Sequence, residues 1–203
     1  MATYAERRRQ QRTEHLFDEA AAIVRVGGLE GLTLNALAKR VGKTPAALYR
    51  YVPSREGLIA ELCVRAAEHV DAQIDETISA LDPSTLAQEP LVGVATVCLT
   101  YVAWAQADES GFALVQAALG DPRPLVDSQA AARLLPIVLR RGAQLGGWLE
   151  AGATAPLPPS TVNGRLLVLW SSLQGVLERR KLERFGLDLP PLGPDDLARA
   201  LAG

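Results

Sequence analysis

The sequence predicts an all-α protein in which a small N-terminal domain, residues 1–57, is joined through a long helix to a larger helical domain, residues 58–203. Two observations predict this fold class. Apolar residues recur every three or four positions along most of the chain, which is the period of a helix face, and the alternation of β-branched and aromatic residues typical of strands is scarce. Hydrophobic residues make up 48% and charged residues 22% of the 203 residues, so the chain is long enough to bury a core.

The first helix is predicted from about residue 5 to Gly27-Gly28, where two glycines end it. One face of this helix is apolar and the other is polar, as expected for a helix that covers a small core. The apolar face consists of Leu16, Ala20, Ile23, Val24 and Gly27.

The second helix is predicted over residues 34–41 and is only two turns long. Thr33 is placed to cap its N-terminus, and Gly42 is placed to end it. Such a short helix does not hold its shape alone, so it requires packing against its neighbours.

The third helix is predicted over residues 45–52. Thr44 caps it, and Pro45 takes the first helical position, where the missing N–H is not needed. Pro53 forbids its continuation. A fourth helix then starts at Ser54 and runs to about residue 80, with an apolar face formed by Leu58, Leu62, Ala66, Val70 and Ile74.

Two short helices separated by a turn around a glycine form a helix-turn-helix. In this motif the second helix enters the DNA major groove while neighbouring elements hold the phosphate backbone. The charge distribution agrees, because basic residues outnumber acidic ones in residues 1–57, whereas the whole chain has a net charge of −2. A basic N-terminal domain on an acidic body favours a polyanionic partner.

Residues 28–62, "GLEGLTLNALAKRVGKTPAALYRYVPSREGLIAEL", resemble the DNA-binding domain of the TetR family of transcriptional regulators. The shared features are a Gly-x-x-x-Leu-Thr start, an alanine within the first short helix, the glycine turn, Leu-Tyr-x-aromatic, and Pro-Ser followed by a basic residue. A second segment, residues 169–182, resembles a Trp-x-x-x-x-Gly helix of some members. The resemblance implies a DNA-binding regulator with a helical ligand-binding and dimerisation bundle.

The resemblance assigns phosphate contacts to Tyr49, Tyr51 and Arg55. The alternative for Tyr49 is a core position, but Leu48 and Val52 already occupy the core positions, so the phosphate role is favoured, more strongly for Tyr51. A phenol supplies a hydroxyl on a stiff arm, and a helix N-terminus shares its free N–H groups with a phosphate. Thr33 is expected to contact a phosphate while capping, and Lys43 is a phosphate neighbour. The arginines of the N-terminal segment either reach the DNA or form a solvated disordered tail; they are Arg7, Arg8, Arg9 and Arg12.

Base contacts are expected from the third helix. Arg50 can pair with guanine, and the alanines can pack on a thymine methyl group. Few of these residues can form hydrogen bonds, so readout of DNA shape is expected to contribute. The candidates are Thr44, Pro45, Ala46, Ala47 and Arg50, with Asn35 from the second helix.

The larger domain is predicted to be helical throughout. Residues 91–106 are apolar on nearly every face, and residues 111–119 form a short helix. Residues 125–149 form a long helix in which Pro136 is expected to cause a kink. After a proline-rich loop, residues 162–184 again carry more than one apolar face.

That last helix is predicted to serve both the core and a homodimer interface, as the family resemblance implies. A two-fold dimer places two helix-turn-helix motifs one turn of DNA apart on a palindromic operator. Small residues, Gly164, Ser171, Ser172 and Gly175, would permit close approach. The contact candidates, not assigned individually to core or interface, are Leu166, Leu169, Trp170, Leu173, Val176 and Leu177.

The resemblance also implies a small-molecule pocket, and the low charge of these helices favours a lipophilic effector. The alternative, that these residues are ordinary core, stays open for each of them. The candidates are Thr100, Tyr101, Trp104, Phe112, Gln116, Gln144, Trp148, Trp170 and Gln174.

The expected function is therefore a ligand-released repressor that binds double-stranded DNA as a dimer; a DNA-binding activator, or a regulator without a ligand, is the alternative. An enzyme is disfavoured, because His15 and His69 lie far apart in the sequence and no metal, nucleophile or phosphate-loop motif is present. No cofactor or metal is expected. Asp195 and Asp196 are interpreted as the start of a final short helix. A helical adaptor would not account for residues 43–55.

The protein is expected to be cytoplasmic and without a membrane partner. Its N-terminus is charged, and no uncharged apolar run reaches the roughly 20 residues of a membrane span. Cys63 and Cys98 both lie in apolar helical patterns, which fits buried reduced thiols.

Overall fold

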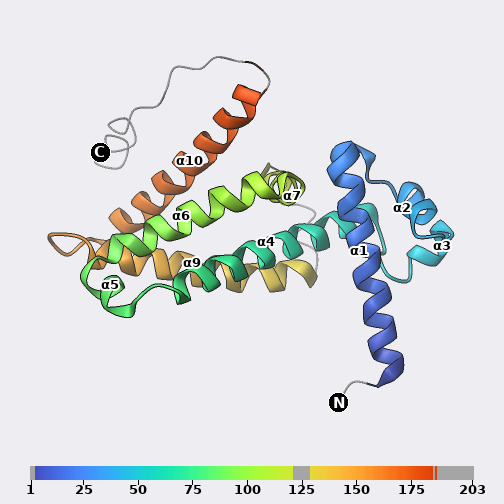
Figure 1. The fold of residues 1–203 in the computed structure, drawn as a ribbon, viewed down its shortest axis with the longest axis horizontal. Coiled ribbons are helices and arrows are strands. Elements are labelled where there is room, and N and C mark those ends of the chain that lie inside the picture. Colours follow the sequence, from blue (N-terminus) through green and yellow to red (C-terminus); the bar gives the residue numbers. More distant parts are fainter. Residues whose placement is uncertain (1–2, 121–128, 185, 187–203) are drawn as a thin grey trace. The chain divides into compact units, whose positions relative to one another are not determined.

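A computed structural model describes residues 3–120, 129–184 and 186, and every regular element among these residues is a helix (Figure 1). The all-α prediction is confirmed. The described residues divide into two compact units. The first unit combines the described residues up to His69 with those of Ala107–Ile137. The second unit combines Val70–Gln106 with the described residues from Val138 onward. These are units of packing; the functional boundary after residue 57 remains a prediction.

Helix α1 extends from Tyr4 to Gly31 and begins with a capping box. The Thr3 side chain accepts a hydrogen bond from the backbone N–H of Glu6, and the Glu6 carboxylate accepts one from the Thr3 N–H at 2.6 Å. Gly28, with φ +64°, interrupts the helical geometry where the sequence predicted the end, and one more turn follows. A side chain there would be strained, because only glycine adopts positive φ readily.

Helices α2, α3 and α4 follow at Leu34–Arg40, Pro45–Leu48 and Arg55–Ser79. Helix α3 is shorter than the predicted 45–52. After Leu48 the chain makes one further turn, in which the N–H groups of residues 51 and 52 both donate to the Leu48 carbonyl. Pro53 disfavours helical geometry in the residue before it and has no N–H to donate, so the helix cannot extend beyond this turn.

The hydrophobic core of the first unit joins α1, α2, α3 and α4 with parts of α7 (Glu109–Gly120) and α9 (Gln129–Ala151). The predicted faces of the first four helices supply most of it, so the short helices gain from tertiary packing the stability that they lack alone. Its buried residues include Leu16, Ala20, Val24, Leu37, Leu48, Val52, Leu58, Leu62, Cys63 and Leu114.

Cys63 lies inside this core. Its Sγ donates a hydrogen bond to the backbone carbonyl of Leu114 on α7 at 3.0 Å. Burial raises the pKa of the Cys63 thiol to about 12, because the thiolate would lose its hydration. The thiol therefore stays protonated at physiological pH.

The second unit contains α5 (Pro83–Gln88), α6 (Pro90–Ala107) and α10 (Pro159–Arg184), with parts of α4 and α9. Helix α5 was not predicted, although Asp82 caps it and Pro83 takes its first position. These are the same signals that located α3. The final helix expected around Asp195, and the part of the predicted 125–149 helix before residue 129, lie outside the described residues.

Among the described residues, α6 is long and apolar enough to cross a membrane by length and composition alone, a test that buried core helices of soluble proteins also pass. One side of this helix is buried within the second unit, at Val94, Val97, Tyr101 and Trp104. The composition of α6 is therefore also that of a core helix.

Gly93 on α6 is buried against the indole of Trp148. A Cβ atom at residue 93 would lie 2.7 Å from that ring, which is too close. We expect Gly93→Ala to lower the free energy of unfolding by about 1–3 kcal/mol, as measured by urea denaturation. Gly147 on α9 is exposed and has open space around it, so Gly147→Ala is the matched control and should stabilise the protein by up to about 1 kcal/mol. Equal stabilities would contradict close packing at Gly93.

Helix α9 lies alongside α4 (Figure 1). Arginines of α9 contact acids of α4 in both units. In the first unit, Arg133 bridges Glu61 at 2.8 Å and Glu68 at 2.6 Å. In the second unit, the contacts are made by Arg140 and Arg141 with Asp71 and Asp75.

These pairs favour the ionised acids, and hydrogen bonding from Arg140 lowers the pKa of Asp75. The sequence pattern did not identify this network.

Candidate nucleic-acid interface

The turn between α2 and α3 is closed by backbone hydrogen bonds and one glycine. Gly42 has φ +63°, a conformation that favours glycine. The Lys43 N–H donates to the Ala38 carbonyl at 2.9 Å. Thr33 and Thr44 cap the two helices, accepting from the N–H groups three residues ahead at 3.0 and 3.3 Å. The predicted caps and turn are therefore all present.

The outer surface of α2 and α3 carries most of the predicted DNA-contact residues. Their side chains take no part in the core beneath, because Leu37, Ala38 and Leu48 fill it. This segment can therefore present polar and charged groups to a ligand without exposing the core. The exposed candidates are Thr33, Asn35, Lys43, Thr44, Pro45, Ala46, Tyr49 and Arg50, whereas Ala47 is half-buried.

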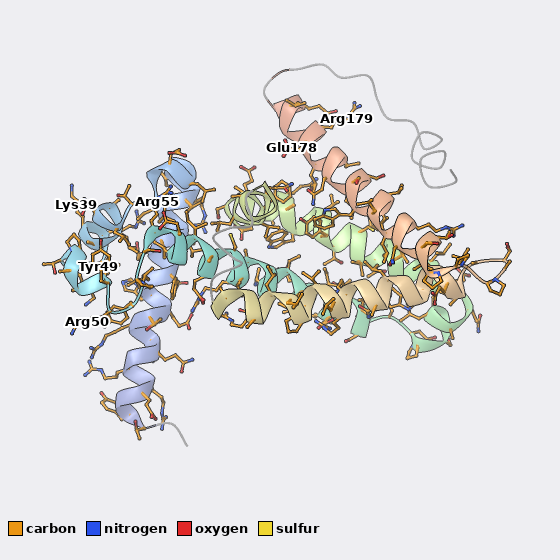
Figure 2. All side chains as sticks on the ribbon, turned by 180° about the vertical axis from the view of Figure 1, so that it is seen from behind. Lys39, Tyr49, Arg50, Arg55, Glu178 and Arg179 are labelled. Atoms are coloured by element: carbon orange, nitrogen blue, oxygen red, sulfur yellow. The ribbon has the colours of Figure 1, made fainter. Side chains whose placement is uncertain are left out.

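Lys39 adds a charge that sequence analysis did not assign. It is exposed, near the C-terminus of α2, and lies four residues after Asn35, so both residues belong to the same helix face. Figure 2 shows Lys39, Tyr49 and Arg50 at the end of the unit that holds α2 and α3. The four-residue spacing from Asn35 was the available signal.

The two tyrosines differ in their surroundings. Tyr49 is 56% exposed, whereas Tyr51 is half-buried and packs against the hydrophobic core of the first unit. Sequence analysis favoured Tyr51 as the phosphate contact. The packing of its ring instead leaves Tyr49 as the more accessible of the two phenols.

Arg55 is engaged within the protein. Its Nε donates to the Leu32 carbonyl and its Nη2 to the Leu29 carbonyl, both at 2.7 Å. Arg40 on α2 pairs with Glu19 on α1. These two arginines therefore hold α2 and α4 to α1, while Lys39 and Arg50 face solvent (Figure 2).

The N-terminal arginines lie on a helix. Helix α1 is helical from Tyr4, so the alternative of a disordered tail is wrong for the described residues from Tyr4 onward. Arg7, Arg8 and Arg12 are exposed, and the Arg8 guanidinium lies 5.7 Å from the ring centroid of Tyr4.

The predicted ligand residues are placed in different environments. Tyr101 is buried, and its ring lies 5.6 Å from that of Trp104 and 5.5 Å from that of Trp170. Gln174 Nε2 donates to the Tyr101 hydroxyl at 3.5 Å. Burial raises the pKa of this phenol. These four residues, with half-buried Thr100, belong to the second unit.

Other ligand candidates have different contacts. Trp148 packs on Gly93, and Gln144 accepts a hydrogen bond from Arg141 at 2.6 Å. Phe112 and Gln116 belong to the first unit, so the structure does not place them with the aromatic group around Tyr101.

Helix α10 separates core residues from exposed apolar residues. Leu177 is buried in its own unit, which places it on the core side of the unassigned candidate set. Leu167 is 66% and Val168 40% exposed; both were omitted from the predicted interface. The other interface candidates, Leu166, Leu169, Leu173 and Val176, are half-buried, whereas Trp170 and the small residues Gly164, Ser171 and Gly175 are exposed.

The fold and this surface define a helical protein with an N-terminal helix-turn-helix. Residues 16–62 match the family model of the bacterial regulatory proteins of the tetR family. The chain is 33% identical over 66 residues to the HTH-type transcriptional repressor KstR of Mycolicibacterium smegmatis. That match covers 32% of this chain and spans about a third, 32%, of the relative.

Solved structures extend the similarity to the remainder of the fold. The regulatory protein SCO4313 aligns with 92% of this chain and 93% of its own at 26% identity, with a TM-score of 0.67. The TetR family transcriptional regulator PfmR of Thermus thermophilus aligns with 78% of this chain and 84% of its own at 16% identity, with a TM-score of 0.54, which shows the fold alone. Residues 16–62 therefore carry the N-terminal domain of the tetR family of bacterial regulatory proteins, and the chain as a whole shares the fold of solved regulators.

Proposed function

We propose that the chain is a repressor that binds a palindromic DNA operator as a homodimer and is released by a small lipophilic molecule. The observation that supports DNA binding is a group of exposed side chains on and just after α2 and α3. Asn35, Lys39, Tyr49 and Arg50 face solvent, and other residues fill the core beneath them. Lysine, arginine and tyrosine in this arrangement suit phosphates and base edges.

The proposed roles follow from exposure. Arg50 and Asn35 contact bases, Ala46 and Ala47 pack on thymine methyl groups, and Tyr49, Lys39 and Lys43 contact phosphates. Thr33 and Thr44 retain their capping roles beside the DNA. Tyr51 and Arg55 contribute from within the domain, Tyr51 by packing against the core and Arg55 by hydrogen bonds to backbone carbonyls.

The dimer interface is proposed on the outer face of α10. Leu167 and Val168 are exposed apolar side chains, and Gly164, Ser171 and Gly175 lie near the same face at intervals that permit close helix approach. A two-fold axis through this face would pair two copies of α10 and give the palindrome its symmetry.

The effector site is proposed at the aromatic group of Tyr101, Trp104 and Trp170, with Gln174 as a polar group that orients the ligand. Helix α4 contributes residues to both units, from Arg55 beside the helix-turn-helix to Ile74 in the second unit. A ligand that prefers one position of α4 would shift the population away from the DNA-binding state, by as much as its affinities for the two states differ. A cytoplasmic location follows from DNA binding.

Genomic selection tests this function. Purified protein is incubated with sheared genomic DNA at near-physiological salt, and the retained fragments are sequenced. We expect enrichment of one palindrome with half-sites about one helical turn, or about 10 base pairs, apart. Retention without a shared sequence would mean binding by charge alone. An enriched non-palindromic site would contradict the dimer, and no retention would contradict DNA binding by the unliganded protein.

A further inference from the structure

Arg55 joins two ends of the helix-turn-helix segment. It is the first residue of α4 and is half-buried. Its guanidinium donates to the carbonyl of Leu32, the residue before the α2 cap Thr33, and to that of Leu29 in the last turn of α1. One side chain therefore connects the start of α2 with the helix that follows α3.

The carbonyls at the end of α1 can accept this second donor: the Leu29 carbonyl already accepts the Leu32 N–H at 3.2 Å, and a carbonyl oxygen has two lone pairs. A helix leaves its last four carbonyls without intrahelical donors, and its C-terminal end favours positive charge. No basic residue lies in the last turn of α1. Arg55 supplies both the charge and the donors from another helix.

Arginine is suited to this position in a way that lysine is not. A guanidinium presents several N–H groups in a fixed fork, so that two of them reach two separate carbonyls at 2.7 Å together. A lysine ammonium keeps the charge but is a compact donor on a flexible stem, and it does not hold two acceptors in one geometry.

We infer that Arg55 is a positioning residue that fixes the orientation of residues 33–54 on DNA, in place of the phosphate contact implied by the family resemblance. This inference rests on the proposed DNA-binding function. Residues 33–54 contain all of α2, the turn and α3. Holding their two ends at Leu32 and Arg55 sets the angle at which Arg50 and Asn35 meet the base edges.

The test separates orientation from charge. Fluorescence anisotropy measures binding of wild type, Arg55→Lys and Arg55→Met to the selected operator and to a scrambled duplex over a salt series. We expect Arg55→Lys to lower operator affinity about tenfold, which is the effect of losing part of a base contact. Its affinity for scrambled DNA, and the slope of log affinity against log salt, should match those of wild type. A change in stability alone would not change the ratio of operator affinity to scrambled-DNA affinity in a folded variant.

The opposite pattern would overturn the inference. If Arg55→Lys binds the operator as wild type does, and Arg55→Met reduces the salt slope by about one phosphate contact, then Arg55 binds DNA directly. Lys39→Met is the charge-loss control, because Lys39 is exposed, and it should reduce the salt slope.

A second variant keeps the test valid if Arg55→Lys does not fold. The Ser54 hydroxyl accepts a hydrogen bond from the Gly57 N–H at 3.0 Å and so caps the turn that carries Arg55. Ser54→Ala loosens this turn while leaving the guanidinium in place. Reduced selectivity for the operator supports the inference, and unchanged selectivity overturns it. Absence of selective binding by wild type would instead be a failure of the proposed function.

Discussion

Replacing Asp71 with alanine is expected to lower the free energy of unfolding by about 3 kcal/mol. Asp71 is 8% exposed, and the Arg141 side chain that contacts it is 11% exposed. Arg141 Nε donates to Asp71 Oδ1 at 3.1 Å, and Arg140 contacts the second carboxylate oxygen. Removing the carboxylate would leave the Arg141 guanidinium buried with only part of its partners, and such a charge is costly.

Urea denaturation at neutral pH measures this effect. Asp75→Ala is the first control, because the Asp75 side chain is 44% exposed, and exposed pairs are worth at most about 1 kcal/mol. The second control replaces both partners, Asp71→Leu with Arg141→Leu, and should recover most of the stability since no unpaired charge remains buried. If Asp71→Ala stays within about 0.5 kcal/mol of wild type, as surface substitutions usually do, the network does not stabilise the second unit.

Ala46→Glu is expected to weaken operator binding at least about 100-fold, because a like charge facing phosphates costs several kcal/mol and each 1.4 kcal/mol is a factor of ten. Ala46 is exposed and follows Pro45 in the first turn of α3. A glutamate in a first turn agrees with the helix dipole, so folding should not suffer. The loss would therefore report the interface itself.

Anisotropy with the selected operator measures this loss, and circular dichroism confirms the fold. Ala46→Gln is the matched control, since it has the same shape without the charge, and it should lose less than a factor of ten. If the glutamate and glutamine variants bind equally well, α3 does not face the DNA phosphates.

The sequence was sufficient to predict the structure where the signals are local. Caps and turns depend on a few adjacent residues, so Thr33, Gly42 and Thr44 predicted the turn and the start of α3 correctly. The same kind of signal, at Asp82 and Pro83, marks α5.

The sequence was insufficient where the partner of a side chain lies far along the chain. Nothing local indicates that Arg55 bonds carbonyls 23 and 26 residues earlier, or that Arg133 meets Glu61. Periodicity also could not choose a face of α10, because that helix is apolar on more than one side. The structure resolves this by burying Leu177 and exposing Leu167.

Chemical modification of the buried Cys63 thiol would indicate that the first unit has opened. A thiol reagent reacts with the thiolate, and in the closed protein Cys63 is 2% exposed, with a pKa of about 12 and its Sγ bonded to the Leu114 carbonyl. Modification therefore requires α7 to leave α4 first. Where closing is faster than labelling, the labelling rate follows the equilibrium between closed and open molecules. With half-buried Cys98 replaced by alanine, the labelling rate of Cys63 would measure how often the first unit opens. Bound DNA or effector would lower or raise that rate.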